Sequence, residues 1–170
     1  MSDRLSHGWL VVRRPGLPGE IVREFLRPAV RAVPRSLAAR LPPCRIALAP
    51  KLADASSQWV ETAEGIHISV AYGEEQAHDV AMEFLTCVGQ ALWEVAESAE
   101  RRAYLRLLKD ELDAGVAGEI DEDAFREKRV LLSSPVLAAS RRQLMKYARA
   151  SFASSVAEYV HCLSHDVTVR

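Results

Sequence analysis

The longest amphipathic pattern in the chain lies in residues 77–97. Its apolar residues recur every three or four positions, the spacing of one buried stripe on an α-helix: Val80, Phe84, Val88, Ala91 and Val95. The neighbouring face is also mostly uncharged, with Thr86, Cys87, Gln90 and Trp93. Because two faces lack charge, the pattern predicts a central helix that is buried on more than one side.

Upstream of this helix the pattern changes to the two-residue alternation of β-strands. Residues 45–49 alternate between two prolines, and residues 58–62 and 65–72 flank an Ala-Glu-Gly turn that predicts a β-hairpin. The second strand of the hairpin has one apolar face and one mixed face: Ile66, Ile68 and Val70 against His67, Ser69 and Ala71. These segments predict a small sheet with one buried side.

Helical patterns fill the rest of the chain. Residues 20–40 predict a kinked helix or two short ones, because Pro28 and Pro34 each limit helix length. Beyond Ser98 the pattern predicts only helices, including one at 122–132 with Asp121 as its N-cap and two more at 134–149 and 151–165. We expect an α+β fold with a small β-sheet and a predominantly helical C-terminal half, in one domain over residues 1–170.

Composition narrows the class of protein. The chain has 170 residues, 49% of them hydrophobic and 26% charged, which is typical of a globular protein. A net charge of −1 gives no reason to expect nucleic acid or an acidic membrane surface as a partner. No apolar run could span a bilayer, and the N-terminus does not resemble a signal peptide. Three isolated cysteines, of which Cys44 and Cys162 are expected in the core, favour reduced thiols and a cytoplasmic location.

The central helix also contains the candidate chemistry. Its segment Thr-Cys-Val-Gly-Gln, followed by Ala91 and Leu92, resembles the H-E-x-x-H helix of zinc metallopeptidases, the zincins. In that family two histidines bind zinc and the glutamate is the general base. The resemblance places Thr86 and Gln90 at the two ligand positions and Cys87 at the position of the glutamate. It implies a zincin-like fold whose catalytic residues have been replaced.

A second segment extends the resemblance. The sequence Val-Ala-Glu-Tyr-Val at 156–160 is similar to the helix that supplies a glutamate as third zinc ligand in one branch of the zincins. On this alignment Glu158 is the one ligand position that survives. Together Thr86, Cys87, Gln90 and Glu158 are then vestigial active-site positions.

The replacements predict that zinc chemistry is lost. Catalytic zinc needs three protein ligands and an open position for water, and the neutral oxygens of Thr86 and Gln90 compete poorly with water. We therefore expect a non-catalytic pseudo-peptidase without metal or other cofactor, in a peptide-binding, protein-binding or support role. In active zincins substrate lies along an edge strand, and the resemblance implies that the analogous strand here is 65–72, with six candidate peptide-binding residues: Gly65, Ile66, His67, Ile68, Ser69 and Val70.

Three alternatives remain open on the sequence. Glu158, His161 and His165 lie on successive turns of one predicted helix and could bind a metal in a genuine enzyme. The chain could instead have a structural or assembly role without any ligand. Finally, the segment at 86–90 could belong to an ordinary core helix with a small-residue contact at Gly89.

Overall fold

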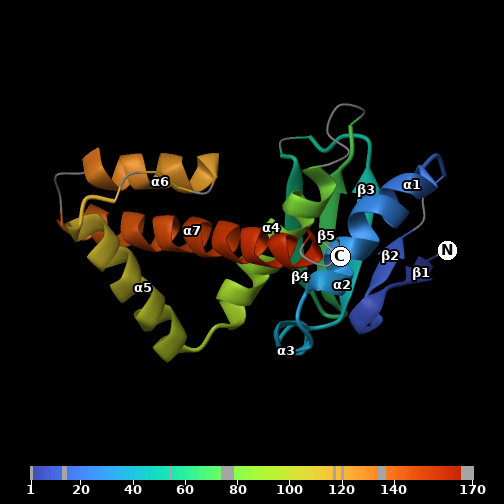
Figure 1. Cartoon of the computed structure of the whole chain (residues 1–170), viewed down its shortest axis with the longest axis horizontal. Helices are drawn as coiled ribbons and strands as arrows, with labels where there is room; N and C mark the ends of the chain where they lie inside the picture. The colour runs from blue at the N-terminus through green and yellow to red at the C-terminus, as the bar shows by residue number, and fades with distance from the viewer. Residues whose placement is uncertain are drawn as a thin grey trace.

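The computed structural model describes residues 2–12, 15–53, 55–73, 79–116, 118–119, 121–133 and 137–165. The strands and the short N-terminal helices lie at one end of the molecule, and two helices of the C-terminal half lie at the other (Figure 1). A long last helix, α7 (Leu137–His165), runs from the second end back to the first and crosses the central helix α4 (Val80–Val95) on the way. The expected α+β architecture with a helical C-terminal half is confirmed.

The sheet has five strands in the order β1-β2-β3-β5-β4. Its strands are β1 (Ser2–Arg4), β2 (Leu10–Val12), β3 (Cys44–Ala49), β4 (Ser57–Thr62) and β5 (Gly65–Ala71). The inner pairs β2–β3 and β3–β5 are parallel, whereas the outer pairs β1–β2 and β4–β5 are antiparallel. The predicted hairpin is therefore confirmed as β4–β5, with Thr62 paired to Gly65 across the turn.

The edge-strand expectation for residues 65–72 is wrong. Strand β5 pairs with β3 along one side and with β4 along the other, so its main-chain groups are already used. Gly65 begins this strand at a φ of 128°, and a Cβ atom there would lie 2.1 Å from the carbonyl oxygen of Pro43. The adjacent amide of Ile66 donates to the same oxygen at 2.8 Å. Glycine thus lets β5 approach the start of β3, which places β5 inside the sheet and leaves β4 at its edge.

The sheet buries one face, as the alternation predicts. Ile66, Ile68 and Val70 are almost fully buried, while His67 and Ser69 on the opposite face are half-buried. The buried face contacts α4, and helices from the N-terminal segment join the same hydrophobic core.

The N-terminal segment forms several short helical pieces, in agreement with the proline positions. They are η1 (Ser6–Gly8), α1 (Gly19–Ile21), a π-helical turn η2 (Val22–Leu26), α2 (Arg27–Ala32) and α3 (Arg35–Ala38). Pro28 lies at the start of α2 and has no amide to donate to the preceding turn, which accounts for the wide turn before it.

Helix α4 is central, as predicted, and ten of its residues are buried. Of the five residues in the predicted apolar stripe, only Val95 is exposed. Its exposed fraction is 39%, because the helix ends there, beyond the sheet. The expectation of separate helices at 134–149 and 151–165 is wrong, since α7 is one helix of 29 residues. Between Arg149 and Ser151 the chain contains neither proline nor glycine, so nothing local ends the helix.

The remaining helices, α5 (Ser98–Asp113) and α6 (Glu122–Ser133), both pack against α7. Asp121 caps α6 as predicted, because its Oδ1 accepts the amide of Ala124 at 2.7 Å. A second, smaller core joins these helices to the end of α4, with Trp93, Leu108, Tyr147 and Ala148 as its buried members. No helix in the described ranges is long and apolar enough to cross a membrane.

Candidate functional site

The site is set by a close crossing of α4 and α7. A Cβ atom on Gly89 would lie 2.6 Å from the carbonyl oxygen of Ala153 and 2.8 Å from its Cα, so only glycine permits this approach. The small-residue contact considered for Gly89 is thus confirmed. It brings the Thr86 side of α4 next to Ser154 and Glu158, which lie just beyond the crossing on α7.

A surface pocket of about 380 Å³ lies at this junction. It unites two of the vestigial positions, Thr86 and Glu158, with residues from the start of α6 and from the approach to β4. Its lining has five carboxylates, three hydroxyls and one methionine: Glu83, Asp121, Glu122, Asp123, Glu158, Ser56, Thr86, Ser154 and Met82. None of these described lining residues is basic, and Asp123 is already paired with Arg126 at 2.8 Å; the other carboxylates favour a cationic group.

The third vestigial position, Gln90, is not part of this pocket. Its Oε1 accepts a hydrogen bond from the indole Nε1 of Trp59, at 3.1 Å, and Trp59 belongs to β4. Two turns earlier on α4, Glu83 accepts a hydrogen bond from the hydroxyl of Ser57, also on β4, at 2.6 Å. These two bonds tie the edge strand to α4. This role of β4 is not predicted from the sequence, although the alternation of Ser57, Trp59 and Glu61 could indicate it.

Cys87 is buried and is not poised for chemistry. Burial is the main cause that raises the pKa of its thiol to about 11; the Ser57 hydroxyl lowers this pKa, and the Glu83 carboxylate raises it by a smaller amount. Burial likewise raises the pKa of Cys44 to about 12, with a smaller contribution from Cys87. Both thiols are therefore protonated near neutral pH, and Cys87 can serve neither as a thiolate ligand nor as a base.

Glu158 is exposed, and its Oε1 accepts a long hydrogen bond of 3.6 Å from the thiol of Cys162. The expectation that Cys162 is a core residue is wrong, because it lies on the solvent side of α7. His161 is half-buried on the same helix, and the side chain of His165 falls outside the described residues. In the described ranges no group of three or more His, Cys, Asp or Glu side chains has a geometry that could hold a metal ion.

Comparisons with known proteins give no relative. The chain matches no protein-family model, and neither a curated protein nor a solved structure is significantly similar to it. Function must therefore be argued from the geometry of the site itself.

Proposed function

We propose that this chain is a zincin-like domain without zinc chemistry, which binds an extended peptide segment along the outer edge of β4. The observation that carries the proposal is the position of β4. Among the described residues no strand pairs with its outer side, and the strand borders the helix that contains Thr86, Cys87 and Gln90. A cytoplasmic setting suits its three cysteines, which form no disulfide among the described residues.

The register of the hairpin identifies which main-chain groups can accept such a segment. The amide of Ala71 donates to the carbonyl of Ser56 at 2.8 Å, which fixes the pairs that exchange hydrogen bonds within the hairpin. Hydrogen-bonded pairs alternate with non-hydrogen-bonded pairs along the hairpin. Gln58, Val60 and Thr62 belong to the hydrogen-bonded pairs, so their main-chain groups point inward, toward β5. The amides and carbonyls of Ser57, Trp59 and Glu61 therefore point outward, where a peptide strand could bind them.

The side chains of two of these residues fix the strand in place. Ser57 and Trp59 are bound to Glu83 and Gln90 of α4, so the edge is held rigidly against the core. A rigid edge lowers the ordering cost of binding a peptide. The carboxylate pocket lies at the Ser56 end of β4, and we infer that the preferred segment has a lysine or arginine there.

The experiment is a binding screen with acetylated heptapeptide amides in a positional-scanning library, followed by N-methylation of the best binder at each position. We expect binding with a lysine or arginine preference at one end. Methylation should abolish binding at every second position, because only alternate amides donate to β4. Equal sensitivity at all positions, or no binder with a Kd below about 1 mM, would contradict the proposal.

A matched pair of variants tests the strand from the protein side. Glu61→Pro removes one outward amide without touching the inner ladder, and Glu61→Ala removes the same side chain but keeps the amide. The proline variant should weaken binding of the selected peptide about tenfold, whereas the alanine variant should bind it nearly as the parent does. Equal affinities of the two variants would exclude main-chain recognition at Glu61.

The zincin resemblance has a separate test. If Thr86, Gln90 and Glu158 descend from a zinc site, the variant Thr86→His/Gln90→His should bind zinc and gain thermal stability, by about 2.7 kcal/mol at a hundredfold excess over Kd. Glu158→Ala added to this variant should remove most of the gain, and Glu94→Ala should not. A folded double variant with no zinc-dependent shift would reject the resemblance without affecting the peptide-binding proposal.

A further inference from the structure

The charges of the chain are segregated along the sequence. The first 50 residues contain nine basic residues, all of them arginine, against three acidic residues, so the formal charge of this segment is +6. The other 120 residues contain 13 basic and 20 acidic residues, with a formal charge of −7. The net charge of −1 thus conceals a strongly basic N-terminal segment, and a segment of this kind favours an anionic partner.

Three of these arginines, Arg23, Arg27 and Arg31, form a ridge along η2 and α2. They follow one another at four-residue steps, so they lie on successive helical turns and span about 12 Å along the axis. All three side chains are exposed. The opposite face of the same segment is buried in the core of the sheet half, with Val22, Leu26, Ala29 and Val30. The backbone that carries the arginine ridge is therefore fixed against the core.

Two adjoining surface hollows lie along the arginine ridge. The first has a volume of about 290 Å³ and is lined by the three ridge arginines with Leu5, Ser6 and Pro28. The second has a volume of about 420 Å³ and shares Arg23 and Arg27 with the first. Glu20, in the second hollow, is the one carboxylate among the described residues that line the two. The hollows therefore form a groove with a strong excess of positive charge.

Nearby carboxylates neutralise the ridge only in part. Arg23 pairs with Glu24 at 2.9 Å, but both side chains are more than half exposed, and Arg27 lies 3.8 Å from Asp3. Within the described ranges Arg31 has no salt-bridge partner. Exposed ion pairs contribute less than about 1 kcal/mol each, so an anionic ligand can replace them at little cost.

The wall opposite the ridge is held in place by His7. Its ring Nε2 donates to the carbonyl oxygen of Val30 in α2, at 3.0 Å, because a carbonyl can only accept. The amide of Leu5 donates to the carbonyl of Trp9 at 2.8 Å and closes the same turn. Ser6, between Leu5 and His7, is thus fixed beside the arginines. Its hydroxyl adds a donor that suits an oxyanion.

We propose that this groove binds a small organic ligand with two or more phosphate groups. One phosphate lies in each hollow, and Arg27 contacts both. The planar guanidinium of arginine binds phosphate through two parallel hydrogen bonds, which a lysine cannot form. The groove lies on the β1 side of the sheet, whereas the peptide site proposed above lies at the β4 edge. The two proposals are therefore independent of each other.

Other polyanions fit the groove less well. Proteins bind single-stranded nucleic acid by stacking its bases on aromatic side chains, and none of the described residues that line the two hollows is aromatic. Peripheral membrane binding uses exposed apolar side chains, and no large hydrophobic residue is exposed in the described part of the segment before Val60. A duplex would need phosphate contacts over a longer surface than this ridge provides.

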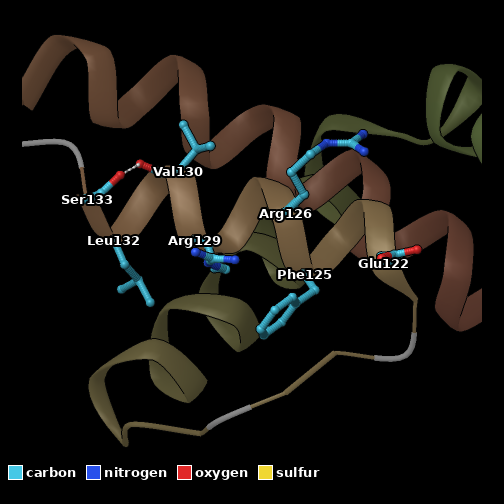
Figure 2. Close-up of a pocket in the computed structure, with 7 residues that line it drawn as sticks. All are labelled: Glu122, Phe125, Arg126, Arg129, Val130, Leu132 and Ser133. Carbon is cyan, nitrogen blue, oxygen red and sulfur yellow. Dashed lines mark hydrogen bonds between the residues drawn. The ribbon is translucent and has the colours of Figure 1, made fainter.

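A hollow on α6 supplies the control for general charge effects (Figure 2). It has a volume of about 730 Å³ and also contains two arginines, Arg126 and Arg129. Arg126 is paired with Asp123 at 2.8 Å, and the guanidinium of Arg129 lies 5.9 Å from the ring centre of Phe125. Arg129 is exposed like the ridge arginines, but its hollow does not gather several cations.

Isothermal titration calorimetry of the full chain with inositol hexakisphosphate, pyrophosphate and orthophosphate, at about 0.15 M salt, tests the proposal. We expect saturable binding of one hexakisphosphate per chain, at least about tenfold tighter than that of orthophosphate. Arg27→Gln and Arg31→Gln should each weaken it about tenfold, whereas Arg129→Gln, which removes the same charge, should change it less than about twofold. Circular dichroism establishes that each variant is folded.

A conservative variant separates fork recognition from simple charge. Arg31→Lys keeps the cation but loses the paired hydrogen bonds, so it should remain at least about threefold weaker than the parent. Full affinity in Arg31→Lys, or equal losses in Arg31→Gln and Arg129→Gln, would overturn the proposal. So would the absence of saturable binding up to about 1 mM, or tighter Arg31-dependent binding of a 30-base-pair DNA or of phosphatidylserine vesicles.

Discussion

The sheet half of the molecule, β1–β5 with α1–α4, and the helical half, α5 to the first part of α7, are stabilised in different ways. One continuous apolar core runs through the sheet half from Leu5 to Val160. The helical half has a small apolar core and depends more on buried polar contacts, chiefly around Lys128. A sheet buries a whole face at once, whereas three diverging helices leave apolar faces without a neighbour. The comparison explains why most of the exposed large apolar side chains of the described chain lie in the helical half.

The largest expected effect is in the sheet half. Gly65→Ala should destabilise the protein by about 3 kcal/mol or more, because the residue has a positive φ and its Cβ would lie 2.1 Å from the Pro43 carbonyl oxygen. Gly73→Ala is the control, since a Cβ there meets nothing closer than 3.8 Å. Urea unfolding measures both. Equal stability of the two variants would show that β5 does not need this approach.

A comparable loss is expected in the helical half when its buried ion pair is broken. Lys128 Nζ lies 3.1 Å from Glu119 Oε1 and donates to the carbonyls of Val116 and Gly118, each at 2.9 Å, with both charged side chains less than a tenth exposed. Lys128→Met leaves the carboxylate buried without its cation, so we expect a loss of about 3 kcal/mol.

The matched control for this variant is Arg149→Met. Arg149 pairs with Glu94 at the same distance of 3.1 Å, but both side chains are nearly half exposed. Its loss should stay below about 1 kcal/mol. If the two variants lose the same stability in urea unfolding, burial is not what makes the Lys128 contact important.

The next largest effect on stability is expected at the crossing of α4 and α7, where the two halves meet. Gly89→Ala would gain up to about 1 kcal/mol of helix propensity, but its Cβ meets backbone atoms of Ala153 that cannot rotate away. Overpacking of this kind costs about 2 kcal/mol, so we expect a net loss of about 1 kcal/mol. Gly19→Ala, where a Cβ meets nothing within 4 Å, should not destabilise the protein. A stabilised Gly89→Ala variant would show that the helices cross at a greater distance.

The smallest expected effect is the pH dependence of stability that the two buried thiols of the core produce. Burial raises the pKa of Cys44 to about 12 and that of Cys87 to about 11, so above the ordinary thiol range the unfolded chain loses protons that the folded chain keeps. Stability should therefore be constant up to pH 8 and fall as the pH rises further, by roughly 1 kcal/mol per pH unit for each thiol. Cys44→Ala should reduce this dependence. At pH 7.5 iodoacetamide should modify Cys162 alone, and rapid modification of Cys87 would contradict its burial.

The sequence predicts those features of the fold that depend on local spacing. The period of the apolar residues identifies α4, the Ala-Glu-Gly turn identifies the β4–β5 hairpin, and Asp121 identifies the start of α6. Strand order depends on which strands meet in space, and alternation within β5 contains no information about its parallel pairing with β3. The sequence therefore predicts the edge at β5, whereas the structure has it at β4, the other strand of the hairpin.

The same limit applies to the site. The spacing of Thr86 and Gln90 predicts a shared helix face, yet the structure directs Gln90 to Trp59 and places Thr86 in the carboxylate pocket with Glu158. Three of the five carboxylates in that pocket come from the start of α6, a segment that no pattern in the sequence connects with α4. Only the tertiary crossing at Gly89 brings them together.

The most direct test of the central claim is amide hydrogen exchange of β4, followed by NMR with and without the peptide selected in the binding screen. In the free protein the inward amides of Gln58, Val60 and Thr62 should exchange slowly, while those of Ser57, Trp59 and Glu61 should exchange fast. Saturating peptide should slow the second set and leave the first set nearly unchanged. If the peptide binds but Ser57, Trp59 and Glu61 continue to exchange fast, the segment does not bind along β4 and the account of this site is wrong.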